Sequence, residues 1–157
     1  MRKFWIGALA AAMITSTAAV AADSPITASD PKSVLAALND LGYQAKLTTE
    51  ANGSSSIEMK IESSPVYVDF YNCDDDHTNC RSIMFVYGID LNDGTTVDKA
   101  NEWNASTIHG FVYLDKNNDP WLEMTMPIYD GISPSLFEDV MKIWRARVGD
   151  MRKFFDL

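Results

Sequence analysis

Histidine, cysteine and basic residues are scarce in this chain. It has two histidines and two cysteines, and its 13 lysines and arginines face 22 aspartates and glutamates. His77 and His109 stand in no spacing that would activate a nucleophile, and there is no Gly-x-Ser-x-Gly segment. We therefore predict no catalytic residue and no cofactor, which favours a binding protein over an enzyme.

The shortage of positive charge also limits the classes of partner that the chain is expected to bind. The formal net charge is −9, and two of the basic residues, Arg2 and Lys3, lie in the first 22 residues. Without that segment the chain has 11 basic and 22 acidic residues, a net charge of about −11. Such a chain repels the phosphates of nucleic acids and of anionic membranes. We expect neither as a partner, whereas a cationic partner would be favoured.

Long apolar runs are absent after residue 22, so no segment there approaches the roughly 20 residues of a membrane-spanning helix. Residues 1–22 place Arg2 and Lys3 before a short apolar core and small residues, which is the order of a secretory signal peptide cleaved near Ala21 or Ala22. We predict a flexible leader at 23–29 and a single domain at 30–157. An even cysteine number after an export signal indicates a periplasmic or secreted protein.

Residues 65–88 form the most informative stretch: two alternating β-type runs joined by an acidic loop between Cys73 and Cys80. If the cysteines lie opposite each other, Phe70 faces Ile83 and one face of the hairpin is continuously apolar. Opposed residues lie about 4.5–5.5 Å apart at Cα, within reach of a disulfide. The spacing and the alternation thus predict the same register.

The second face of this hairpin is mixed in character. It would carry Tyr67, Asp69, Tyr71, Ser82, Met84 and Val86. Aromatic and apolar side chains on an otherwise polar sheet face are typical of an interaction surface. We take Tyr67, Asp69, Tyr71, Met84 and Val86 as the candidate face for a protein partner or for self-association as a homodimer.

Periodicity and capping residues predict the other elements. Helices are expected at 31–41, 97–106 and 134–154, and strands at 43–49, 56–62, 108–116 and 121–128. Asp30, Thr95 or Thr96, and Ser133 are the expected N-caps. The order α-β-β-β-β-α-β-β-α predicts an α+β fold, an antiparallel sheet with helices packed on one face.

Two features of these elements concern which side chains are buried. The hairpin at 108–128 has two equally good registers, one burying Phe111 and Tyr113 and the other Val112 and Leu114, and the sequence does not choose between them. Trp103 and Trp144 are expected to pack between helix and sheet.

The acidic loop contains residue types that bind metal ions. Asp74, Asp75, Asp76 and His77 could ligate a divalent cation, and two thiolates could hold zinc. However, the cysteines are separated by six residues, and an oxidising compartment would join them as a disulfide. We predict no metal site and interpret the loop as a charged hairpin tip that discourages aggregation.

Several later segments carry a family resemblance. They are Asn101-Glu-Trp103-Asn104, Tyr113-Leu-Asp115, Leu122-Glu123, Gly131-Ile-Ser133, Phe137 and Trp144. With these segments the chain resembles the YbjN family, described as bacterial sensory transduction regulators with a fold similar to type III secretion chaperones. The resemblance extends over most of the chain after residue 30. It implies a chaperone-like α+β architecture, self-association and no catalytic apparatus.

The resemblance has two departures. Family members often have a basic residue where this chain has Gly110-Phe111-Val112, and an acidic residue where it has Thr125. A binding role that depends on those charges is not expected here. The preferred function is an exported binding, chaperone-like or regulatory module. The alternatives are a secreted acidic inhibitor of a cationic enzyme such as a lysozyme, and a small hydrolase using Glu123 or His77.

Overall fold

The computed structural model describes residues 25–157, so the predicted signal peptide at 1–22 lies outside the described residues. The elements are α1 (Pro31–Asp40), β1 (Lys46–Thr49), β2 (Ser55–Ile61), β3 (Ser64–Tyr71), β4 (Ser82–Gly88), α2 (Val97–Ser106), β5 (Phe111–Leu114), β6 (Pro120–Pro127) and α3 (Pro134–Phe154). Their order is the predicted one.

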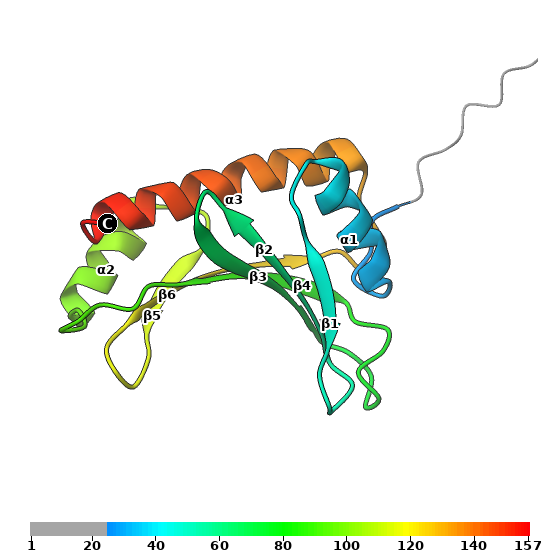
Figure 1. The fold of residues 1–157 in the computed structure, drawn as a ribbon, viewed down its shortest axis with the longest axis horizontal. Helices are drawn as coiled ribbons and strands as arrows, with labels where there is room; N and C mark the ends of the chain where they lie inside the picture. The colour runs from blue at the N-terminus through cyan, green and yellow to red at the C-terminus, as the bar shows by residue number, and fades with distance from the viewer. Residues whose placement is uncertain (1–24) are drawn as a thin grey trace, which may run out of the picture.

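The strands form one six-stranded sheet in the order β1-β2-β3-β4-β6-β5, and every neighbouring pair is antiparallel. Helix α3 lies across one face of the sheet, with α1 near its beginning and α2 near its end (Figure 1). The predicted α+β class, with helices on one face, is confirmed. Among residues 25–157, no helix is both long enough and apolar enough to cross a bilayer.

The β3–β4 hairpin has the predicted register. Phe70 pairs with Ile83, and the ladder ends where Tyr71 pairs with Ser82. Beyond it a disulfide joins Cys73 and Cys80, whose Cα atoms are 3.8 Å apart. This separation is shorter than that of opposed strand residues, because both cysteines lie in the loop after the strands have ended.

The apolar face of the hairpin packs against α3. Trp144 of α3 is fully buried and its ring lies 5.5 Å from the ring of Phe85. The helix begins as predicted, with Pro134 in its first turn and the Ser133 hydroxyl accepting a hydrogen bond from the Leu136 amide. Its stripe of apolar side chains therefore covers the centre of the sheet.

The predicted flexible leader at 23–29 is wrong for the residues that the structure describes. Ile26 forms an antiparallel bridge with Ile132, and each backbone amide donates to the other residue's carbonyl at 3.0 Å. Ile26 and Ala28 are buried. The polar composition suggested mobility, but pairing with a segment more than a hundred residues later fixes this stretch.

Two predicted strands were too long. The strand expected at 43–49 begins only at Lys46, and the one expected at 108–116 is limited to β5. Gly110 has a φ of 78°, which interrupts the extended conformation before β5. Ile108 lies outside the sheet and is 92% exposed.

The open register of the second hairpin is resolved by Asn104. Its side-chain Nδ2 donates to the Val112 carbonyl at 3.0 Å, and its Oδ1 accepts from the Val112 amide at 2.7 Å. This amide group therefore occupies the place of a neighbouring strand at the edge of the sheet. Val112 is buried opposite Leu122, while Phe111 and Tyr113 lie on the other face.

Removing the disulfide should destabilise the fold without changing it. We expect the double variant Cys73→Ser, Cys80→Ser to lose about 2–3 kcal/mol of unfolding free energy, because a short loop is no longer closed in the unfolded chain. Urea unfolding followed by circular dichroism measures this. Reductant should lower the wild-type midpoint and leave that of the variant unchanged. Equal midpoints for both proteins, each measured with and without reductant, would contradict the prediction.

Asn104→Asp tests the edge contact with almost no change of shape. The new carboxylate would face the Val112 carbonyl without a proton to donate, so we expect a loss of about 1–3 kcal/mol of unfolding free energy. Asn101→Asp, on an exposed position of the same helix, makes the same charge change and is the control. Equal urea midpoints for the two variants would show that the contact is unimportant.

Candidate functional site

The candidate site is the sheet face opposite α3, here called the open face. No helix of residues 25–157 covers it (Figure 1). Strand alternation and the observed pairings assign to it Ser56 and Glu58 from β2, Tyr67, Asp69 and Tyr71 from β3, Met84 and Val86 from β4, Trp121, Glu123 and Thr125 from β6, and Phe111 and Tyr113 from β5.

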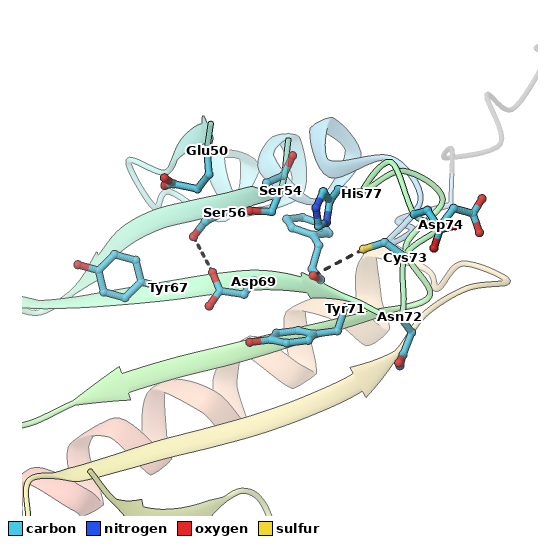
Figure 2. A pocket seen from close by; sticks show the side chains of 13 residues that line it. Glu50, Ser54, Ser56, Tyr67, Asp69, Tyr71, Asn72, Cys73, Asp74 and His77 are labelled. Atoms are coloured by element: carbon cyan, nitrogen blue, oxygen red, sulfur yellow. Dashed lines mark hydrogen bonds between the residues drawn. The ribbon is translucent and has the colours of Figure 1, made fainter. Parts of the chain in front are cut away.

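Strand β3 supplies the predicted centre of this face. Tyr67, Asp69 and Tyr71 alternate along the strand, and Tyr71 is 44% exposed. The Ser56 hydroxyl donates to Oδ1 of Asp69 at 2.6 Å, which fixes the carboxylate between the two tyrosines (Figure 2). The structure therefore brings together these three predicted residues.

Strand β4 contributes less than predicted. Met84 is partly exposed, but Val86 is only 7% exposed and lies between Tyr67 and Glu123 in the pairing. The larger side chains on either side leave little of Val86 for a partner. We therefore correct its assignment: Val86 lies on the predicted face but is a buried part of it.

The second hairpin extends the face beyond what the sequence indicated. Phe111 and Tyr113 are 47% and 40% exposed, because the register that buries Val112 turns them outward. Trp121 also lies on this face, where its ring covers Gly88: a Cβ at Gly88 would be 2.9 Å from the indole. For Phe111 and Tyr113, the register that buries Val112 and Leu114 was the only sign in the sequence that they face outward.

Tyrosines and carboxylates influence one another across the face. The pKa of Tyr71 is raised, mainly by burial and then by the negative charges of Asp69 and Glu123. Burial also raises the pKa of Tyr113, reinforced by the charge and hydrogen bonding of Glu123. Both phenols therefore remain neutral donors over the physiological range.

A hollow of about 850 Å³ opens at one end of the open face, here called the acidic hollow. The β1–β2 turn and the disulfide loop border it, and the β3 side chains line its floor (Figure 2). Its lining residues are Glu50, Ser54, Ser55, Ser56, Tyr67, Asp69, Phe70, Tyr71, Asn72, Cys73, Asp74, Asp75 and His77. The hollow thus combines carboxylates with aromatic rings.

The acidic loop uses several of its oxygens to hold its own shape. Asp74 accepts a hydrogen bond from Asn79 at 2.9 Å, and Asp76 accepts from the Thr78 hydroxyl at 2.7 Å. The hydrogen bonds from Thr78 lower the pKa of Asp76. Within residues 25–157, no three histidine, cysteine, aspartate or glutamate side chains converge as metal ligands.

Most residues that carry the family resemblance lie in the core or hold a turn in shape, away from the open face. Trp103 is buried with its ring edge-on to Phe154, and Asp115 accepts from the backbone amides of Asn117 and Asp119 in the β5–β6 turn. Asn101 is exposed on α2. Of the quoted motif residues, Tyr113 and Glu123 are the pair that reaches the open face.

The residues considered for hydrolysis, Glu123 and His77, lie on different elements, and the other histidine, His109, lies on a third segment. His109 contacts Thr107 through its backbone, with its carbonyl accepting from and its amide donating to the Thr107 hydroxyl. His77 lies in the disulfide loop, whereas Glu123 lies on β6 beside Tyr113. The chemistry that the open face offers is stacking, hydrogen bonding and charge attraction.

Glu123→Gln should lower the pKa of both tyrosines, since it removes a nearby negative charge. NMR titration of ring-labelled tyrosines measures this, with Glu102→Gln on α2 as the control. Because the raised pKa values disfavour ionised tyrosines in the folded state, the fold keeps its full stability below about pH 10 and loses stability as the pH rises through the raised values. An unchanged titration of Tyr113 in the Glu123 variant would contradict the contact.

Comparison with solved structures found similar folds. A crystal structure of YbjN, a "putative transcription regulator from E. coli", superposes with a TM-score of 0.54 at 13% identity, covering 78% of this chain and 88% of that one. The Yersinia pestis type III secretion chaperone SycH, in complex with a fragment of YscM2, gives a TM-score of 0.47 at 14% identity, covering 73% and 93%.

Sequence comparison is decisive for the family. A search among curated proteins gave no match. The family model YbjN, described as "Putative bacterial sensory transduction regulator", matches residues 30–157. This match covers all nine elements of the fold. The chain therefore belongs to the YbjN family.

Proposed function

We propose that the chain is a non-enzymatic binding module that holds a protein partner on the open face. One observation carries this proposal: exposed aromatic side chains on strands β3 and β5 share one sheet face, which no described helix covers. Tyr71, Phe111 and Tyr113 are each at least 40% exposed. Tyrosine and other aromatic residues are enriched at protein interfaces, where a rigid ring buries a large area at low entropic cost.

The architecture suits a rigid binding platform. The open face is made of regular strands, and its opposite side is packed against α3 through a continuous core. Side chains on such a scaffold keep their relative positions, so little ordering is needed when a partner binds. The family description as a sensory transduction regulator supports a role through binding.

We further propose that this binding takes place outside the cytoplasm. The disulfide between Cys73 and Cys80 supports an oxidising compartment, since such bonds are rare in reducing ones. The basic and then apolar sequence of residues 1–22 supports export. The periplasm is accordingly where we would look for the partner.

A second candidate function is inhibition of a cationic enzyme. It is favoured by the acidic hollow, which places Glu50, Asp69, Asp74 and Asp75 around one opening. A cationic enzyme would be attracted to this end of the face, and the association would weaken with salt. Inhibition would then be one consequence of binding on the same surface.

Photocrosslinking tests the use of the open face. A photoreactive residue at Thr125, exposed on β6, should form adducts with a partner in cells, whereas one at Glu102 on α2 should not. Tyr71→Lys should reduce the Thr125 adducts by about tenfold or more, because it replaces a contact ring by a charge that must be desolvated.

The control for this substitution is Leu136→Lys, which adds the same charge at a half-exposed position on α3. Both variants should retain the wild-type circular dichroism spectrum and urea midpoint to within about 1 kcal/mol. If the Tyr71 and Leu136 variants give the same adducts as the wild type, the open face is not the binding surface.

A further inference from the structure

The charges of the open side are separated along the sheet. The acidic hollow has four carboxylate residues in its lining and neither lysine nor arginine. Lys46 and Lys60 lie instead beside a smaller hollow, where they alternate with Glu58 and Glu62. The acidic hollow is therefore a place of uncompensated negative charge, while the neighbouring one is nearly neutral.

Inside the acidic hollow, one carboxylate has a defined orientation. Asp69 accepts the Ser56 hydrogen bond through Oδ1, so its second oxygen, Oδ2, is left to receive a ligand. Among the described residues, no lysine or arginine forms an ion pair with Asp69. Figure 2 shows the Asp69 carboxylate on the open side of the sheet, joined by its hydrogen bond to Ser56 of β2.

Aromatic rings flank this carboxylate on the same strand. Tyr67 and Tyr71 lie two residues before and after Asp69, and because side chains alternate, all three project from one face. A guanidinium group is planar: it can pair with a carboxylate through two N–H groups and at the same time stack on a tyrosine ring. An ammonium group can use the charge but lacks the flat surface and the fork.

The hollow is also larger than one side chain requires. Its volume of about 850 Å³ would admit a short stretch of polypeptide as well as a guanidinium group. Its walls are held in place, since the disulfide closes the loop that carries Asp74 and Asp75, and Gly53 of the β1–β2 turn lies against His77 of that loop.

From these observations we infer the chemistry of the partner, an inference that rests on the proposed function. The acidic hollow receives an arginine side chain from an extended, cationic segment of the partner protein. The guanidinium pairs with Asp69 and stacks on one of the two flanking rings, Tyr67 or Tyr71. Asp74, Asp75 and Glu50 attract neighbouring cationic residues of the same segment.

A defined peptide tests this without the natural partner. The probe is a fluorescent peptide in which arginine alternates with valine, compared with the same peptide carrying citrulline, which keeps the shape of arginine but not its charge. Fluorescence anisotropy with the purified protein should show saturable binding of the arginine peptide and at least tenfold weaker binding of the citrulline peptide. A lysine version should bind several-fold more weakly than the arginine version.

Substitutions of single aspartates test where on the protein the arginine peptide binds. Asp69→Asn keeps the acceptor for Ser56 but removes the charge, and should weaken binding about tenfold or more. Asp75→Asn, in the exposed loop, should weaken peptide binding two- to threefold. Because Asp75 is exposed, this substitution alters no buried side chain and should leave folding unaffected. Asp93→Asn, an exposed residue in the β4–α2 loop, makes the same charge change and should leave binding unaltered.

The possible results separate the inference from the proposed function. Equal losses for Asp69→Asn and Asp93→Asn would show diffuse charge attraction and overturn the arginine site, as would equal binding of the citrulline peptide. If the arginine peptide fails to bind but Tyr71→Lys still removes the crosslinks at Thr125, this inference alone is wrong. If Tyr71→Lys leaves those crosslinks intact, the proposed function is wrong as well.

Discussion

The pairing of β3 with β4 is the constraint on which the rest of the molecule depends. Its register places Phe85 against Trp144 of α3, and by the same alternation it sends Tyr67, Asp69 and Tyr71 to the opposite side. A slip of one residue would exchange the two faces. The packing on the helix side and the set of side chains presented on the open side are therefore consequences of one hydrogen-bonding ladder.

The open face combines aromatic rings with unpaired negative charge, and this combination favours a different protein over a second copy as its occupant. Two copies meeting face to face would bring the carboxylates around Asp69 and Glu123 towards each other, and like charges in an interface are costly. A cationic segment would gain from the same arrangement. Thus the negative charge that would attract the proposed cationic partner also opposes the self-association that the family resemblance implies.

The sequence specified the central hairpin well because two independent constraints, cysteine spacing and alternation, required the same register. It could not decide the second hairpin, because Phe111 and Tyr113 can fill a buried strand face as well as Val112 and Leu114 can. The register is set by Asn104 of α2, whose side chain hydrogen-bonds the Val112 backbone. This contact forms only when the helix packs beside the strand, so no local pattern in the sequence indicates it. The acidic hollow was likewise hidden, since it arises where the β1–β2 turn meets the disulfide loop, two segments that neither alternation nor capping relates.

The two ends of the open face differ in how they relate to the family resemblance. Tyr113 and Glu123, at the β5–β6 end, belong to the motifs that carry it, and the other motif residues mainly shape the turn, the edge and the core around them. The residues of the acidic hollow lie outside those motifs. A fold fixes where a site can be built, while the side chains placed there determine what binds. Family membership therefore accounts for the platform, and the chemistry of the partner must be deduced from Asp69 and the residues around it.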